Sequence, residues 1–385
     1  MNPAVPASVE TKFPLSLLCL SASWGGLELN TVRFADWMRR RGWPVQLITL
    51  PDSPIAARAT ALELPVALLT NRWKAADVPA AGRLAGVLRA FKSQVLIVSR
   101  NGDLGLAVLC KTVHLPALKL VYQQHMQLGL AKRGCVHTLR YRALDAWLAP
   151  LPGLARQVLT QTRLAPSKLH VVPLGIELEK FADPALTRAV ARQHFHLDLP
   201  ADAVLLGLIG RFDDGKGQDF LVEELAVLRQ RFPNLHLLLV GEPTRNEGNT
   251  YRDAVLRRVR ELGLEAVVHV REFTPRPELA YRALDISVTG SSNETYGMVT
   301  IEAMAAGRAV VATATGGTLE IVEDGCTGLL FPLRDAAAFG AAVTRLLREP
   351  GLAETVGRQA QAAALATYSH HRQCELTEHV LFQLG

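Results

Sequence analysis

The sequence has no long hydrophobic run, few aromatic residues and few cysteines. Its apolar runs, such as residues 203–210, are far shorter than the roughly 18 to 20 residues that a membrane-spanning helix needs. The cysteines are odd in number and scattered, and they form no C-x-x-C pair, which excludes a disulfide scaffold and a cysteine-based zinc site. The five are Cys19, Cys110, Cys135, Cys326 and Cys374.

The start of the chain lacks the basic region of a signal peptide, and the apolar stretch after Lys12 is only strand-sized. We therefore expect a cytoplasmic protein. The adjacent His370 and His371 are interpreted as part of a polar turn before the last helix. We accordingly expect no metal ion and no other bound cofactor.

Strand-sized apolar segments alternate with helix-length segments along all 385 residues. This alternation is typical of α/β proteins, in which helices cover both faces of a parallel sheet. The expected strands are 15–21, 45–50, 66–69, 95–99, 119–125 and 146–149, followed by 204–210, 235–241, 267–270, 286–289 and 309–313. The expected helices include 27–41, 79–91 and 219–231. The two series of strands predict two doubly wound sheets.

Pro173 and Gly175 lie between the two series and are typical of a linker. We expect a Rossmann-like first domain at residues 1–173 and a Rossmann-like second domain at 174–367, with a ligand cleft between them. The segment 368–385 has a helical pattern, and packing back onto the first domain is one arrangement open to it.

Positive charge is concentrated in the first part of the chain. Residues up to Pro173 include 21 Lys and Arg against 8 Asp and Glu, whereas the remainder has 21 and 28. No acidic residue occurs between Asp103 and Asp145. The basic residues in that window are Lys111, Lys119, Lys132, Arg133, Arg140 and Arg142. Such a field favours an anionic ligand or an anionic membrane surface, and a solvated basic surface without a partner is the alternative.

Nucleic acid is not the expected partner, because no DNA- or RNA-binding signature is present and few aromatic residues lie among the basic ones. A membrane surface could include Trp37, Trp43 and Trp73 together with the basic run 39–41. Tryptophan is at least as often a core residue, so both interpretations stay open.

Three segments each follow a predicted strand and open a helix, where backbone N–H groups and the helix dipole favour an anion. In the first, 21–28, Gly25 and Gly26 could bring the backbone close to a ligand, or could simply form a tight turn. The spacing is not G-x-G-x-x-G, so it does not predict a nicotinamide dinucleotide site.

The second segment, 210–217, reads G-R-F-D-D-G-K-G. Arg211 offers planar, bidentate donors to phosphate oxygens, Lys216 offers a mobile charge, and the glycines let the backbone approach. The segment is not a P-loop, because Gly217 stands where a magnesium-binding hydroxyl is required. We expect it to bind a diphosphate, with an ordinary surface loop as the alternative.

The third segment, 291–307, carries Glu294 and Glu302. Eight residues of helix span about 12 Å. This exceeds the roughly 5 to 9.5 Å between the paired carboxyl groups of a glycosidase. The two carboxylates could instead hold the two ends of a long ligand through its hydroxyl groups. A helix cap or a solvated surface is the alternative for either residue taken alone.

These motifs closely resemble those of glycosyltransferase family 4. The resemblance rests on G-R-F-D-D-G-K-G, on the x7 spacing of Glu294 and Glu302 within N-E-T-Y-G-M-V-T-I-E-A-M-A-A-G-R, and on G-G-T-L-E-I-V-E-D-G-C-T-G-L-L-F after them. It is strong over residues 203–332. It implies the GT-B fold, retaining transfer and a nucleotide-sugar donor, with a UDP-sugar expected first and GDP- or ADP-sugars as alternatives.

The resemblance also implies roles for matching positions. In the second domain, Arg211 and Lys216, with Gly210 at the start of their loop, would grip the donor diphosphate. Glu302 would bind the ribose, and Glu294 would contact hydroxyls of the transferred sugar. The backbone N–H groups of Gly297, Met298 and Val299 would help to hold the phosphate or sugar.

In the first domain, the resemblance places the Gly25–Gly26 backbone at the donor diphosphate and His125 near the transferred sugar. As a bare residue, His125 is more often structural. The chain has no D-x-D motif, so cationic side chains would have to stabilise the leaving phosphate in place of a metal.

For the acceptor, the basic first half favours an anionic glycolipid or a glycan of the lipopolysaccharide-core type, with the enzyme peripheral at the cytoplasmic membrane face. The alternatives are a transferase that makes a small soluble glycoside, a GT-B phosphorylase or epimerase, and a non-catalytic nucleotide-sugar binder.

Overall fold

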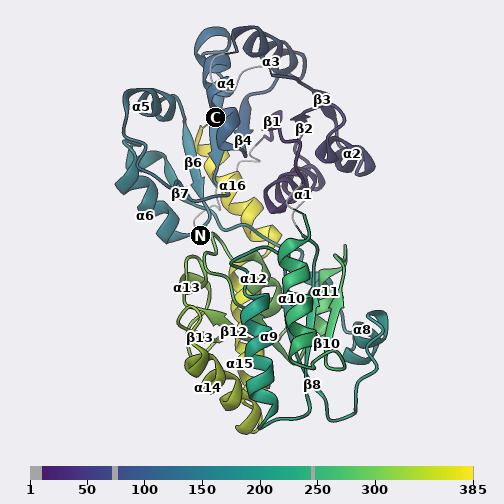
Figure 1. Cartoon of the computed structure of the whole chain (residues 1–385). Coiled ribbons are helices and arrows are strands. Elements are labelled where there is room, and N and C mark those ends of the chain that lie inside the picture. The colour runs from purple at the N-terminus through teal and green to yellow at the C-terminus, as the bar shows by residue number, and fades with distance from the viewer. Residues whose placement is uncertain (1–10, 72–76, 244–247, 385) are drawn as a thin grey trace, which may run out of the picture. The chain divides into compact units, whose positions relative to one another are not determined.

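The computed structural model describes residues 11–71, 77–243 and 248–384 (Figure 1). The chain divides into two compact units. The first unit runs to Gly175 and includes the helix from His370 onward, and the second extends from Ile176 to Ser369. The division follows Gly175 rather than Pro173. None of the described helices combines the length and the apolar character needed to cross a membrane.

The first unit is built on a seven-stranded parallel sheet in the order β3-β2-β1-β4-β5-β6-β7. The strands are β1 (Leu15–Cys19), β2 (Val45–Thr49), β3 (Val66–Leu68), β4 (Val95–Val98), β5 (Lys119–Gln123), β6 (Ala146–Ala149) and β7 (Leu169–Val171). β1 pairs with both β2 and β4, with Leu15 opposite Val45 on one side and Val95 on the other. The order reverses direction between β1 and β4, which makes this the topological switch point of the sheet.

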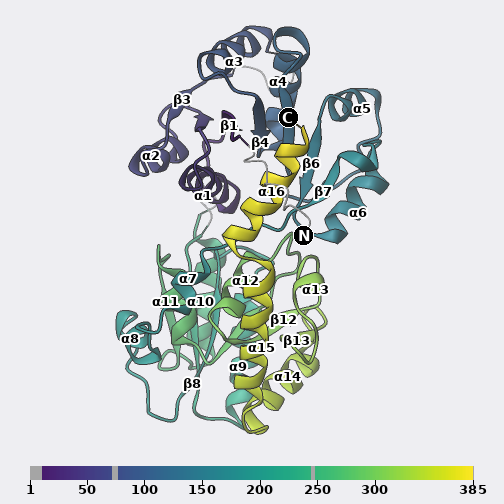
Figure 2. The same cartoon turned by 180° about the vertical axis from the view of Figure 1, so that it is seen from behind.

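Helices cover both faces of this sheet. They are α1 (Gly26–Arg40), α2 (Pro54–Ala61), α3 (Val78–Ala90), α4 (Leu104–Leu109), α5 (Cys135–Arg142), α6 (Pro152–Gln161) and α16 (His370–Leu384), with short 3₁₀ turns at Asn101–Asp103 and Pro166–Lys168 and a π turn at Cys110–His114. One apolar core joins α1, α2 and α16 to the sheet, and a separate core joins α3 to α6 to its other face. Figure 2 shows α16 beside the strands of the first unit.

The structure favours the core interpretation for two of the three tryptophans. Trp37 and Trp43 are buried in the core that α1 shares with α16. The neighbouring cations are paired: Arg39 and Arg40 form ion pairs with Asp36, and Arg41 pairs with Glu378 of α16. Trp73, the third candidate, lies outside the described residues.

The second unit is built on a six-stranded parallel sheet in the order β10-β9-β8-β11-β12-β13. The strands are β8 (Val204–Ile209), β9 (Leu235–Val240), β10 (Val268–Arg271), β11 (Ile286–Thr289), β12 (Ala309–Thr313) and β13 (Leu329–Phe331). The order reverses between β8 and β11, so the switch point of this sheet lies there. A strand that runs into Pro173 is expected from the sequence and corresponds to β7, whereas β13 was not predicted.

Helices also cover both faces of the second sheet. They are α7 (Leu178–Ala182), α8 (Arg188–His194), α9 (Gln218–Arg229), α10 (Thr250–Glu261), α11 (Pro277–Ala283), α12 (Met298–Ala305), α13 (Thr318–Ile321), α14 (Ala336–Arg348) and α15 (Leu352–Thr367). α9, α10 and α14 share an apolar core with the strands. In Figure 2, α15 lies on the near side of this unit, and it packs against α12 and β12.

Several strands end earlier than the sequence pattern predicts. β1 ends at Cys19 rather than Ser21, and β5 ends at Gln123 rather than His125. The extra residues belong to loops at the carboxyl ends of the strands, yet they are buried. Because these residues are buried, their sequence pattern resembles that of a strand. The loops that contain them form the pocket described below.

Candidate functional site

Two loops meet at the switch point of the second unit. One follows β8 and carries Gly210, Arg211 and Lys216; the other follows β11 and carries Glu294. The chain places them together because β8 and β11 are neighbours in the sheet although they are far apart in sequence. Ligands of doubly wound sheets bind in such a position, outside the carboxyl ends of the strands.

Glycines allow close contact between these loops. Gly217 has a φ of +91°, and a Cβ on it would lie 2.7 Å from the carbonyl oxygen of Gly290. Gly215, at φ +83°, accepts a 2.8 Å hydrogen bond from the backbone N–H of Ser292. A residue with a side chain at position 217 would therefore push the two loops apart.

This contact brings together two of the predicted site residues. The Lys216 ammonium lies 3.2 Å from a carboxylate oxygen of Glu294, and both side chains are largely shielded from solvent. The pair is a cation and an acceptor of hydrogen bonds at the carboxyl end of the sheet. Such a pair can bind a ligand that carries both an anionic group and hydroxyl groups.

A glycine pair holds the Glu294 backbone in place. The N–H of Gly317 donates a 2.7 Å hydrogen bond to the Glu294 carbonyl. A Cβ on Gly316 would lie 2.1 Å from the same oxygen, which explains why glycine stands there. α12 then begins at Met298, with Gly297 at its N-terminus in the left-handed conformation, at φ +103°. Met298 and Val299 form the first turn of this helix.

Glu302 lies within α12. The Tyr281 hydroxyl donates a 3.2 Å hydrogen bond to the Glu302 carboxylate. Burial, together with the negative charges of Glu302 and Glu294, raises the pKa of Tyr281. Tyr281 therefore stays protonated and fixes the Glu302 carboxylate. The loop position of Glu294 and the helical position of Glu302 are those predicted.

Arg211 forms an ion pair with Asp213 of the same loop, at 3.2 Å. Its side chain is exposed. The loop backbone is nevertheless held, because the buried Gln218 side chain donates a 2.7 Å hydrogen bond to the Arg211 carbonyl. Arg211 is thus a surface cation on an anchored loop.

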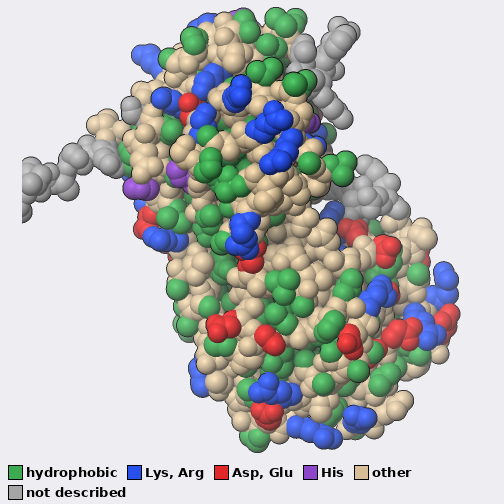
Figure 3. All heavy atoms as spheres, turned by 90° about the vertical axis from the view of Figure 1, so that its left-hand side faces the viewer, with side chains coloured by type: hydrophobic (Ala, Val, Ile, Leu, Met, Phe, Trp, Pro, Cys, Tyr) green, Lys and Arg blue, Asp and Glu red, His purple; other side chains and the backbone are tan. Residues whose placement is uncertain are grey.

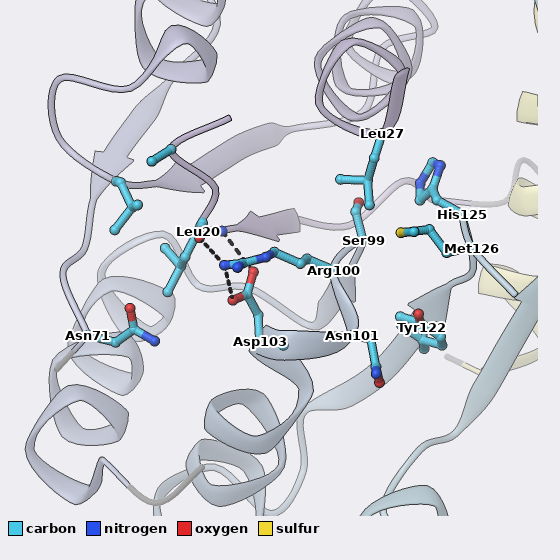
Figure 4. Close-up of a pocket in the computed structure, with 13 residues that line it drawn as sticks. Leu20, Leu27, Asn71, Ser99, Arg100, Asn101, Asp103, Tyr122, His125 and Met126 are labelled. Atoms are coloured by element: carbon cyan, nitrogen blue, oxygen red, sulfur yellow. Dashed lines mark hydrogen bonds and ion pairs between the residues drawn. The ribbon is translucent and has the colours of Figure 1, made fainter. Parts of the chain in front are cut away.

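The first unit has a pocket of about 540 Å³ at its own switch point (Figure 4). It is lined by residues of the loops after β1 to β5, together with Leu27 of α1 and Tyr122 of β5. The predicted residue His125 belongs to it, together with Leu20, Ala22, Leu27, Leu50, Asn71, Ser99, Arg100, Asn101, Gly102, Asp103, Tyr122 and Met126.

A buried carboxylate connects the loops after β1 and β4. Asp103 accepts a 2.8 Å hydrogen bond from the Leu20 N–H, and Arg100 donates to the Leu20 carbonyl and lies 3.5 Å from Asp103. Figure 4 shows Arg100 extending between the two partners. Burial raises the pKa of Asp103 to about 6, against the lowering effects of the Leu20 hydrogen bond and Arg100. Arg100 and Asp103 therefore hold the backbone of Leu20, just before the loop that carries Gly25 and Gly26.

Two polar groups in the pocket wall have no hydrogen-bond partner within the described part of the chain: the Ser99 hydroxyl and both ring nitrogens of His125. Both residues are buried. Burial lowers the pKa of His125 to about 4, so its imidazole is neutral at pH 7. A neutral imidazole both donates and accepts, which suits a ligand hydroxyl group.

Gly25 and Gly26 are not required by the fold around them. Neither has a positive φ, and a Cβ on Gly26 would meet no atom within 4 Å. A Cβ on Gly25 would meet only the Glu28 carboxylate, at an ordinary contact distance of 3.4 Å. A tight turn therefore does not explain why glycine stands at these positions, because any residue can adopt their backbone conformation.

Ser99, Arg100, Asp103 and Tyr281 are site residues that were not predicted from the sequence. Ser99 is the last residue of the predicted strand 95–99 and Arg100 follows it, which was a usable signal. Gly316 and Gly317 begin the third motif quoted for the family resemblance, but no role was predicted for them. No local pattern marks Asp103 or Tyr281, because their partners lie 83 and 21 residues away.

Two family models match the chain. The one described as Glycosyltransferase Family 4 covers residues 24–180, and the one described as Glycosyl transferases group 1 covers 203–349. The chain is 30% identical over 367 residues to a D-inositol 3-phosphate glycosyltransferase of Thermomonospora curvata, covering 85% of this chain and 83% of the relative.

A D-inositol 3-phosphate glycosyltransferase of Kribbella flavida is 34% identical over 224 residues, covering 57% of this chain and 52% of the relative. In that alignment the chain spans about half the length of its relative.

Among solved structures, Anabaena Alr3699/HepE in complex with UDP superposes with a TM-score of 0.83 at 20% identity, covering 97% of this chain and 100% of the other. At this identity, the likeness establishes the fold. The matched family models and the similarity over most of the chain show that this protein belongs to glycosyltransferase family 4 and has the GT-B fold.

Proposed function

We propose that this protein transfers a sugar from a nucleoside diphosphate sugar to an acceptor hydroxyl, with retention at the anomeric carbon and without a metal ion. The Lys216–Glu294 pair at the switch point of the second unit carries the proposal. It sets a cation for the diphosphate beside an acceptor for sugar hydroxyls. Family membership and the UDP complex of the Anabaena neighbour support a UDP-sugar first, with GDP- and ADP-sugars as alternatives.

Each predicted residue has a place in this proposal. Lys216 and Arg211, on the anchored loop that starts at Gly210, bind the diphosphate. The first turn of α12, from Gly297 through Met298 and Val299, supplies backbone N–H groups to the phosphate or sugar. Glu294 accepts from hydroxyls of the transferred sugar, and Glu302, fixed by Tyr281, accepts from the ribose.

In the first unit, the open space over Gly26 supports approach of the Gly25–Gly26 backbone to the diphosphate. The neutral, unpartnered His125 suits a hydroxyl of the transferred sugar or of the acceptor. His125 acts by positioning the sugar or acceptor, since a group with a pKa of about 4 is a weak base.

The proposed reaction breaks the bond between the sugar C1 and the diphosphate oxygen and forms a bond from C1 to the acceptor oxygen on the same face. The acceptor proton passes to the departing phosphate oxygen. Negative charge grows on that phosphate, and Lys216 and Arg211 stabilise it. Removing one such charge costs on the order of 10² to 10³ in rate.

The acceptor is proposed to bind in the pocket of the first unit. Its unpartnered Ser99 hydroxyl and His125 nitrogens match a polyol. A small phosphorylated polyol is one candidate, favoured by the names of the relatives. The glycan of an anionic glycolipid, of the lipopolysaccharide-core type, at the cytoplasmic membrane face is the other, favoured by the excess of cationic residues before Pro173.

The donor proposal is tested by thermal shift of the whole chain with UDP, GDP, ADP and their sugars, in EDTA and in magnesium. A ligand at about 100 times its Kd adds roughly 2.7 kcal/mol of stability. We expect one nucleotide family to stabilise the protein equally in both buffers, and Lys216→Ala to abolish the shift. Arg345→Ala, which removes an exposed ion pair on α14, is the matched control and should keep it.

The transfer proposal is tested with the donor so identified and with D-inositol 3-phosphate or a phosphorylated glycolipid as acceptor. The anomeric configuration of the product, read by NMR, should match that of the donor. A Lys216→Ala enzyme with unchanged turnover, an inverted product, or activity that needs inorganic phosphate and no nucleotide would each contradict the proposal. The last outcome would indicate a phosphorylase.

A further inference from the structure

Helix α5 and the chain before it expose apolar side chains. Leu130 is 84% exposed, Val136 70% and Leu139 65%. Val136 and Leu139 are three residues apart, so they lie on one face of α5. The opposite face is buried through Thr138 and Tyr141. The outward apolar side chains therefore contribute little to the core of the first unit.

Basic residues lie among these apolar ones. Lys132, Arg133, Arg140 and Arg142 all fall between Leu130 and the end of α5, and in the described part of the chain none of them forms an ion pair. Burial and the neighbouring charges of Lys132 and Arg140 lower the pKa of His137. On the face of the first unit drawn in Figure 3, blue basic side chains lie among green hydrophobic ones, with little red.

The fold holds this surface firmly. The Tyr141 ring packs edge-on against buried Trp147, with centroids 5.1 Å apart. At the same C-terminal end of α5, the Lys168 ammonium donates a 2.9 Å hydrogen bond to the Arg142 carbonyl. α5 is thus anchored by one face and by its C-terminus, while the other face stays open to solvent.

We propose that residues 130–142, here called the basic apolar segment, dock the protein on an anionic phospholipid membrane. Apolar side chains at helix spacing enter the boundary between headgroups and acyl chains, while Lys and Arg remain at the anionic headgroups. The inference goes beyond the transfer reaction, since it concerns attachment rather than chemistry.

The test is sedimentation of the full chain with vesicles of phosphatidylcholine alone or mixed with phosphatidylglycerol. We expect binding to the mixed vesicles only, weakening as salt rises. Lys132→Ala and Arg133→Ala should each lower the affinity about fivefold. The double variant Val136→Asp/Leu139→Asp should lower it more than tenfold. Matched controls are Val227→Asp on α9 and Arg260→Ala on α10, both exposed in the second unit.

Insertion is read independently through Cys135, which is exposed at the start of α5, whereas Cys19, Cys110 and Cys374 are buried. In a Cys326→Ser background, an environment-sensitive dye on Cys135 should shift to the blue with mixed vesicles. The inference would be overturned if the protein bound phosphatidylcholine vesicles equally well, or bound no vesicles, whether or not it self-associates. It would also be overturned if the control variants lost vesicle binding. Transfer to a soluble acceptor without vesicles should be unchanged in the segment variants, which separates this inference from the proposed reaction.

Discussion

At the scale of single residues, burial sets the charge of two side chains in the first-unit pocket. His125 is neutral because desolvation opposes its protonation, whereas Asp103 holds a proton more tightly than an exposed carboxyl group. The shift of His125 lowers the stability of the fold at acid pH, whereas the shift of Asp103 lowers it towards neutral pH. All five tryptophans lie in the first unit, so tryptophan fluorescence reports the unfolding of that unit alone.

The first prediction concerns His125. The unfolded chain binds a proton at its ordinary pKa of 6.5, and the folded state only at about 4. Stability is therefore lost as pH falls from about 6.5 towards 4. Between pH 7 and pH 5, the wild type should lose about 2 kcal/mol more than His125→Gln. Urea unfolding followed by tryptophan fluorescence checks this; equal losses in the two proteins would show that the imidazole is not buried in solution.

The second prediction concerns Asp103, whose folded-state pKa of about 6 exceeds its ordinary 3.8. Its stabilisation is present below about pH 4 and is lost as pH rises through 6. The wild type should lose about 2 to 3 kcal/mol relative to Asp103→Asn between pH 4 and pH 7. The amide keeps an oxygen for the Leu20 N–H, so the variant should fold. The same fluorescence titration applies, and a pH-independent difference would refute the assigned shift.

At the scale of elements, loop contacts rather than helices or strands build both candidate sites. The loops after β8 and β11 touch through glycine backbones, and the loops after β1 and β4 are joined by Asp103. In each sheet these are the loops on either side of the point where the strand order reverses. The sheet supplies rigid support, and the loops supply the chemical groups.

The third prediction follows from this contact. Gly217→Ala places a side chain at φ +91° and 2.7 Å from the Gly290 carbonyl oxygen, so the loops must separate. We expect a loss of more than about 1 kcal/mol in stability and weaker nucleotide binding, because Lys216 moves away from Glu294. Calorimetric melting and titration with UDP measure the two effects.

Gly340→Ala is the control for that variant. Gly340 lies inside α14 of the same unit, and a Cβ there meets no atom within 4 Å. Alanine should stabilise this helix by roughly 0.5 to 1 kcal/mol without changing nucleotide binding. A Gly217→Ala protein that behaves like Gly340→Ala would show that the loop contact is not needed.

At the scale of the whole molecule, the end of the chain completes the first unit. α16 contributes Cys374, Val380 and Leu381 to the core that includes α1. Its buried Gln373 accepts a 2.6 Å hydrogen bond from the N–H of Gly175. Gly175 is the last residue of the first of the two segments that form this unit. The first unit is therefore discontinuous in sequence, and its stability depends on the last helix.

The fourth prediction tests this dependence. Glu378 accepts hydrogen bonds from Arg41 at 3.0 and 2.6 Å and from the Trp43 indole at 2.8 Å. Glu378→Ala leaves these partly buried donors unpaired and should destabilise the first unit by about 1 to 3 kcal/mol. Glu375→Ala, which removes an exposed carboxylate of the same helix, should change stability by less than about 0.5 kcal/mol.

The effect of Glu378 should depend on pH. Burial alone would raise its pKa, but the hydrogen bonds from Arg41 and Trp43 outweigh burial and lower it. Its contribution is therefore present above the ordinary pKa of 4.5 and is lost as pH falls through the lowered folded-state value. Tryptophan fluorescence at pH 7 and at acid pH should show the variant and wild type converging; a constant difference would contradict the assignment.

The sequence by itself determined the α/β class, eleven of the strands within a few residues, and the loops that carry Lys216, Glu294 and His125. Hydrophobic alternation, glycine positions and motif spacing are properties of short windows, so they can be recognised without the fold. Family membership followed from the same motifs, and the comparisons confirmed it.

Only the tertiary structure decided which of these groups meet. Lys216 and Glu294 are 78 residues apart, Leu20 and Asp103 are 83 apart, and Arg41 and Glu378 are 337 apart. The order of strands in each sheet sets the first two contacts, and the return of the last helix sets the third. Burial of Trp37 and Trp43, and the shifted pKa values of His125 and Asp103, also depend on packing between distant segments, which no local pattern encodes.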